Sequence, residues 1–177
     1  MLWSIAFDHL GVVTSDIYFV DPDPGEGQEG AERGVRLELR QFHRAPLQGS
    51  IYSAVPVRID RPLWRVDLLE SVSSAPGSLD RAHHHPRFTG WEPGRRVFVE
   101  ELSADPVGWL RTRLADPAAV LDEAGEDPAD HSADLGALRE AGPLIGGTVE
   151  HLLAAVAAGR AGTAPDVVGD AVRASWL

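Results

Sequence analysis

The sequence predicts an α+β protein in which an antiparallel, β-rich N-terminal half packs against a C-terminal group of short α-helices. Within residues 1–102, apolar residues alternate with polar ones in short runs, which is the spacing of strands with one buried face. Residues 103–177 hold most of the alanine and place leucine and valine at helical spacing. No long helical period precedes Ser103. We therefore expect residues 1–102 and 103–177 to form one compact unit.

The clearest predicted strand spans residues 35–40, where Val35, Leu37 and Leu39 alternate with charged residues. Further strands are expected over 2–13, 17–20, 51–59, 64–69 and 96–99, with a break at 14–16. The Pro-, Gly- and acid-rich stretch 21–34 predicts a mobile loop. Consecutive strands separated by turns favour an antiparallel sheet that closes into a barrel or forms a sandwich.

Aspartate followed by proline marks the expected helix starts in the C-terminal half. Proline suits the first helical position, and the preceding aspartate can accept hydrogen bonds from the free amides. The steps are Asp105-Pro106, Asp116-Pro117 and Asp127-Pro128, and Ala164-Pro165 marks another start. Helices are expected over 105–115, 117–124, 128–141, 143–159 and 165–176, with Gly142 and Gly159 as stops.

The residue types that are missing exclude several kinds of chemistry. The chain has no cysteine, and all 16 basic residues are arginine. Disulfides, thiolate metal sites and cysteine nucleophiles are therefore excluded. Without lysine the chain also lacks a Walker A phosphate loop and a Schiff base to pyridoxal phosphate.

The charge balance and the hydropathy pattern bear on partners and location. A net charge of −11 without a cluster of arginines in the sequence argues against nucleic acid and anionic membranes as partners. No apolar run is long enough to span a bilayer, and the N-terminus lacks the features of a secretory signal. We expect a cytoplasmic protein, and self-association into a homo-oligomer stays open.

The strongest local signal for a site is the run of three histidines at residues 83–85. In an extended strand, His83 and His85 point to one face, so their imidazoles could bind one metal ion. Glu92 is the first acidic residue downstream and is the candidate third ligand, while Asp67, Glu70 and His43 are alternatives if folding brings them near. In a second interpretation, the histidines lie in a turn or at the edge of the core, hydrogen-bonded and without metal.

The spacing Gly77, five residues, His83, one residue, His85 resembles the beginning of the first motif of the cupin superfamily. This resemblance implies a small barrel that holds a divalent transition metal through two histidines and a nearby glutamate. It further implies a substrate that is an organic acid or is sugar-like, with Lewis-acid or oxygen-activating chemistry at an open coordination position.

Arginine and tryptophan residues flank the histidines and could contact such a ligand. Arg87 and Trp91 are the candidate ligand-binding residues, and Arg95 and Arg96 lie close by in the sequence. Guanidinium forks beside an aromatic wall suit a carboxylate or phosphate, although the same residues could instead pack the sheet edge. A second acidic group, formed by Asp127, Asp130, His131 and Asp134, is interpreted as a solvated helix face.

The sequence therefore predicts a metal-dependent protein that binds a small molecule, and an enzyme is one form of it. No catalytic residue can be assigned. The alternative is a non-catalytic interaction or oligomerisation module whose helical half supplies the contact surface.

Overall fold

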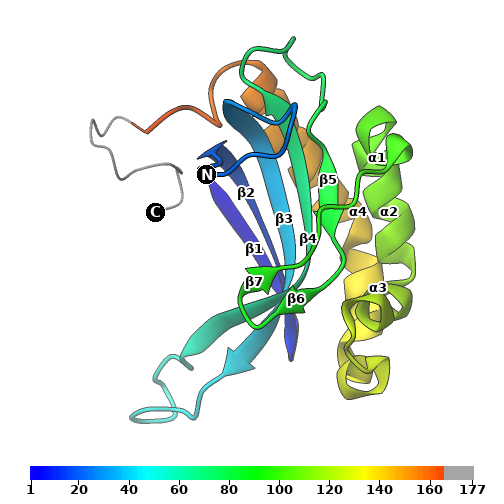
Figure 1. Ribbon diagram of the computed structural model, residues 1–177. Coiled ribbons are helices and arrows are strands. Elements are labelled where there is room, and N and C mark those ends of the chain that lie inside the picture. The colour runs from blue at the N-terminus through cyan, green and yellow to red at the C-terminus, as the bar shows by residue number, and fades with distance from the viewer. Residues whose placement is uncertain (166–177) are drawn as a thin grey trace.

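The computed structural model describes residues 1–165, and it has the predicted α+β architecture: an antiparallel sheet with a layer of helices on one face (Figure 1). The five strands of the main sheet are β1 (Leu2–Ala6), β2 (Leu10–Val20), β3 (Ala31–Arg44), β4 (Val57–Ser71) and β5 (His83–His85). A small second sheet pairs β6 (Phe88–Thr89) with β7 (Glu92–Pro93). The helices are α1 (Glu100–Ala104), α2 (Pro106–Ala115), α3 (Pro117–Ala124), the 3-10 helix η1 (Pro128–His131) and α4 (Ser132–Ala157).

The main sheet is open. Its strands follow chain order from β1 to β5, and each pairs antiparallel with the next. Strands β1 and β5 lie at opposite edges of this order, so the described strands do not close into a barrel. Of the helices among residues 1–165, none has the length and apolar character needed to cross a membrane.

Alternation along the two central strands gives the sheet an apolar face and a charged face. Leu37 on β3 is paired with Val66 on β4, and both are fully buried against the helices. The intervening side chains point to the face that the helices leave uncovered, because successive residues of a strand point to opposite sides. Burial of the apolar side chains against α2, α3 and α4 provides the main driving force for holding the two layers together.

The turn between β1 and β2 lies at residues 7–9 and not at the predicted break at 14–16, where β2 is continuous. A buried carboxylate from α4 explains the position of this turn. Asp134 accepts hydrogen bonds from the backbone amides of Asp8 (3.0 Å), His9 (2.7 Å) and Leu10 (2.8 Å). The prediction that Asp134 lies on a solvated helix face was therefore wrong, as it was for His131, which is also buried.

Strands β3 and β4 form a long hairpin that extends beyond the helical layer (Figure 1). β3 begins at Ala31, so the predicted loop 21–34 is shorter at its C-terminal end. The predicted strand 51–59 is formed only from Val57 onward. Gly49 has a positive φ of 99°, and Ser53 donates its amide to the Ser50 carbonyl at 2.9 Å, so the preceding residues turn instead.

The predicted starts of α2 and α3 are confirmed. The carboxylate of Asp105 accepts the amide of Gly108, and that of Asp116 accepts the amide of Ala119. Asp127 likewise accepts the amide of Ala129 at the start of η1. Each aspartate satisfies one of the amides that have no partner within the first turn of its helix.

One long helix, α4, replaces the two helices predicted over 128–141 and 143–159. Pro143 lies inside it, although proline removes one backbone hydrogen bond and usually ends or bends a helix. Packing of Leu138 and Ile145, on either side of the proline, into the core outweighs that local cost. Gly142 is therefore not a stop, whereas Gly159, with φ +66°, follows the end of α4 as predicted. The helix expected over 165–176 falls outside the described residues except for its first residue.

Candidate metal centre

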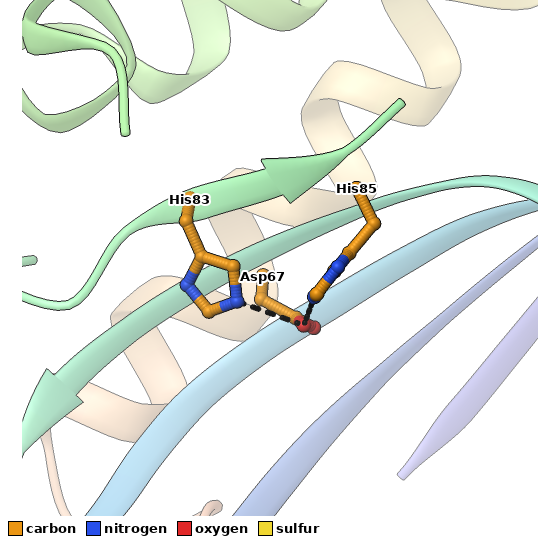
Figure 2. A group of neighbouring side chains, drawn as sticks. All are labelled: Asp67, His83 and His85. Carbon is orange, nitrogen blue, oxygen red and sulfur yellow. Dashed lines mark ion pairs between the residues drawn. The ribbon is translucent and has the colours of Figure 1, made fainter. Parts of the chain in front are cut away.

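Two adjacent strands bring Asp67, His83 and His85 together on the uncovered face of the sheet (Figure 2). In the β4–β5 pair, Asp67 is directly opposite His83, and Arg65 is opposite His85. Because strand residues alternate between faces, both histidines project on the same side as Asp67. The predicted placement of His83 and His85 on one face is therefore confirmed.

The three side chains present their ligand atoms to one another. The Nε2 atoms of His83 and His85 each lie 3.5 Å from Oδ2 of Asp67. One ligand atom from each residue lies within 4.8 Å of the others, and all three residues are buried. Ligands at the corners of a tetrahedron with metal bonds of about 2.1 Å are about 3.4 Å apart, so the two Nε2–Oδ2 separations suit a divalent ion.

Backbone carbonyls fix the orientation of both imidazoles. Nδ1 of His83 lies 2.8 Å from the carbonyl oxygen of Arg81, and Nδ1 of His85 lies 2.8 Å from that of Gly94. A carbonyl can only accept, so each Nδ1 carries the proton and donates it. In the neutral imidazole the lone pair is then on Nε2, the atom that faces Asp67. Metal-binding histidines have this arrangement of an anchored Nδ1–H and a free Nε2.

Arg36 holds Asp67 from the neighbouring strand. Its Nε donates to Oδ1 at 2.6 Å and its Nη2 donates to Oδ2 at 3.2 Å. Burial alone would raise the pKa of Asp67, but the charge of Arg36 and its two hydrogen bonds to the carboxylate more than offset burial and lower that pKa. Asp67 is therefore a charged carboxylate that can serve as a ligand, and Arg36 orients it.

The imidazole of His83 is kept neutral. Burial lowers the pKa of His83 to about 4, despite the opposing attraction of Asp67. At pH 7 the imidazole of His83 is therefore deprotonated at Nε2, which is the form that binds metal.

A hollow of about 430 Å³ opens over the three residues. Three arginines line it with Asp67 and the two histidines, and the remaining lining residues are largely apolar. The lining residues are Phe19, Arg36, Arg65, Asp67, Leu69, His83, His85, Pro93, Gly94 and Arg96. We call this hollow the arginine pocket.

The middle histidine belongs to the core and not to the site. His84 points to the helix-covered face, where its ring lies 6.4 Å from Trp64 and 5.2 Å from Trp109, centroid to centroid. Trp64 and Trp109 stack on each other at 6.0 Å. Burial lowers the pKa of His84 as well, so this core imidazole is also neutral.

The other predicted site residues lie outside this cluster. Glu92 is exposed on β7 and is not among the three grouped ligands, in which Asp67 supplies the carboxylate. Arg87 is exposed and donates its Nε to the Glu123 carbonyl at 2.7 Å, beside a different hollow. Trp91 is 59% exposed, and the Arg40 guanidinium lies 5.4 Å from its ring centroid.

Glu70 and His43, the other two alternative ligands, are paired with residues outside the cluster. Glu70 is buried and pairs with Arg33 at 2.9 Å, and His43 lies 3.4 Å from Asp60. Sequence reasoning missed Arg36 and Arg65 as site residues. The available signal was their position on the polar side of two alternating strands, on the same side as Asp67.

Comparison of the chain with protein-family models, curated proteins and solved structures finds no match. Two imidazole nitrogens and one carboxylate oxygen converge beside an open pocket, so a metal ion bound there would keep coordination positions directed at a ligand.

Proposed function

We propose that this protein binds a divalent transition metal through Asp67, His83 and His85 and uses it to bind a small molecule in the arginine pocket. The observation that carries the proposal is the pair of Nε2 atoms facing Oδ2 of Asp67, with both Nδ1 atoms anchored on carbonyls. The cofactor is a divalent transition metal whose identity the three ligands leave open, because imidazole and carboxylate suit zinc, iron, manganese and nickel.

An enzyme acting on an organic acid or a sugar-like substrate is the form of this function that we propose. The metal would supply Lewis acidity, or oxygen activation in the case of iron. Asp67 and the histidines would hold the ion, Arg36 would keep the Asp67 carboxylate oriented, and the apolar wall of the pocket would limit access of water to the bound molecule. Membership of the cupin superfamily stays a prediction, and so does cytoplasmic location.

The test is metal analysis of protein purified without a histidine tag. We expect roughly one transition metal ion per chain, or uptake of one after incubation with zinc, manganese, iron or nickel. His83→Ala, His85→Ala and Asp67→Asn should each lower metal affinity by at least about tenfold, because each removes or weakens one of three ligands.

His43→Ala is the matched control. His43 is a half-exposed histidine outside the cluster, so its loss removes one imidazole from the chain without touching the site. Equal metal binding by all four variants, or no metal uptake by the unmodified protein, would contradict the proposed centre.

A second candidate function, an interaction or oligomerisation module, is supported by exposed apolar residues at the tip of the β3–β4 hairpin. Ile51 is 82% exposed and Tyr52 is 91% exposed, with Leu47, Val55 and Val57 nearby in sequence. A group of exposed apolar side chains of this kind is typical of a contact surface. Light scattering coupled to size-exclusion chromatography, on the unmodified chain and on the Ile51→Ser, Tyr52→Ser double variant, would reveal self-association through this tip.

A further inference from the structure

We infer that the arginine pocket selects a small organic anion, whose charged group contacts Arg65 beside the metal centre and whose apolar body lies against Phe19 and Leu69. This inference rests on the proposed function for the neighbouring metal ion. Of the two ligand classes in the proposed function, organic acids and sugar-like molecules, the inference selects the organic acids.

The charges around the pocket favour an anion. Among the charged side chains that line it, three are arginines and one, Asp67, is acidic, although the chain as a whole carries a net charge of −11. Beside the pocket, the single carboxylate of Glu38 pairs with both Arg65 and Arg40. Among residues 1–165, the one negative charge of Glu38 is thus shared between the two guanidinium groups of Arg40 and Arg65.

Arg96, the third arginine of the pocket, has an acidic partner of its own. It is held by Asp21 at 2.9 Å and by the side chain of Gln28. Glu32 lies close enough to interact electrostatically with Arg96, but burial raises the pKa of Glu32 and disfavours its charged form. A divalent ion on the three ligands would add two positive charges, so the pocket becomes more attractive to an anion when the metal is bound.

Arg65 is the guanidinium that is positioned to receive the anion. Its Nε donates to Oε1 of Glu38 at 2.8 Å, and its Nη2 lies 2.7 Å from the same oxygen. Within residues 1–165, its Nη1 donates no hydrogen bond to the protein. The guanidinium also lies 5.0 Å from the ring centroid of Phe88. Glu38 and Phe88 thus hold it in place before a ligand arrives, which lowers the entropic cost of binding.

The remainder of the pocket lining favours an apolar body attached to the charged group of the ligand. Phe19, Leu69 and Pro93 offer no side-chain hydrogen-bond donor or acceptor. A sugar would bury hydroxyl groups against these residues without partners, which is unfavourable. A ligand with a carboxylate on a compact apolar body would pair its charge with the guanidinium and would pack its apolar part against these residues.

The test compares benzoate with benzamide, which has nearly the same shape but no charge, by titration followed by NMR on zinc-loaded and metal-free protein. We expect benzoate to bind at least about tenfold more tightly than benzamide, and Arg65→Gln to remove most of that difference. Arg139→Gln is the control, because this exposed arginine on α4 donates to the Ala115 carbonyl, away from the pocket. Arg65→Gln should fold, since Glu38 keeps Arg40 as a partner, and its melting temperature is measured alongside.

The outcomes separate this inference from the proposed metal centre. A benzoate preference that depends on Arg65 in metal-free protein supports the inference even if no metal ever binds. Normal zinc binding together with equal affinities for benzoate and benzamide, or with no benzoate binding at millimolar concentrations, overturns the inference and leaves the metal centre intact. Loss of the preference in Arg87→Gln but not in Arg65→Gln would also overturn it and would assign the anion to Arg87.

Discussion

The two faces of the main sheet are built from the same strands and have opposite chemistry. On the helix-covered face, Leu37 and Val66 are cross-strand neighbours in a dry core. One residue earlier on β3 and one residue later on β4, Arg36 and Asp67 form a cross-strand ion pair under the arginine pocket. Because side chains alternate between the two faces, residues that stabilise the core and residues that form the candidate site are neighbours in the same two strands.

The two faces should therefore respond differently to substitution. On the covered face, each large side chain contributes to stability through packing, and its loss leaves a cavity. On the charged face, desolvation of the ionised groups cancels much of their mutual attraction, so the charges as a set add little to stability. We expect them to be needed for binding.

Trp64→Ala should have the largest effect on stability. Trp64 is fully buried and stacks on Trp109 of α2, so its removal leaves a large cavity between the sheet and the helices. We expect a loss of about 3–5 kcal/mol in the free energy of unfolding, measured by urea denaturation. Val57→Ala, at an exposed position of the same strand, should change it by less than about 0.5 kcal/mol. Similar effects from both variants would show that the layers are not held by this core.

Breaking the ion pair on the charged face should come next in size. Asp67→Ala leaves Arg36 partly buried without its bidentate partner, which should cost about 3 kcal/mol. The double variant Arg36→Met, Asp67→Leu should recover most of that loss, because two apolar side chains replace two desolvated charges. Thermal or urea unfolding measures both variants, and metal binding should be lost in both. A double variant no more stable than Asp67→Ala would show that the pair contributes to stability after all.

The pH dependence of stability gives the most specific effect, and this effect is the smallest when it is counted per pH unit. The pKa of His83 is about 4 in the folded chain, against an ordinary value of 6.5, so the unfolded chain binds more protons between these two pH values. The free energy of unfolding of metal-free protein should then fall as pH falls from 6.5 towards 4, by up to about 1.4 kcal/mol per pH unit for this group. His84, whose pKa is also lowered, adds to the fall with the same sign.

Asp67 extends the loss to lower pH. Its folded pKa is lowered, so its contribution is present above its ordinary value of 3.8 and is lost as pH falls below it. His83→Gln should flatten the slope between pH 6.5 and 4 and leave the loss at lower pH in place. An unchanged slope in His83→Gln would assign the effect to other groups.

Predictions from the sequence were right for features that depend on residues close together in the chain. They were wrong or incomplete for features that depend on contacts between distant segments. Alternation predicted that His83 and His85 share a face, and aspartate before proline predicted the starts of α2 and α3. The third ligand depends on the register between β4 and β5, which places Asp67 opposite His83. Nothing local to the histidines encodes that register, so Asp67 was only one of several alternatives to Glu92.

Long-range contacts also explain the errors in the fold. Asp134 caps a turn more than 120 residues away in the chain, which helical spacing cannot reveal. The continuity of α4 through Pro143 likewise depends on the surface against which the helix packs. In both cases a distant partner, absent from any local pattern, decides the structure.

The three consecutive histidines of β5 make the site sensitive to a change in the register of that strand. A slip by one residue would place the imidazole of His84 alone on the charged face and would bury His83 and His85 beneath the helices. The packing of the His84 ring against Trp64 and Trp109 opposes this movement. Insertions and deletions of a single residue between β4 and β5 should therefore be tolerated only where the loop absorbs them and His84 keeps its contacts with the two tryptophans.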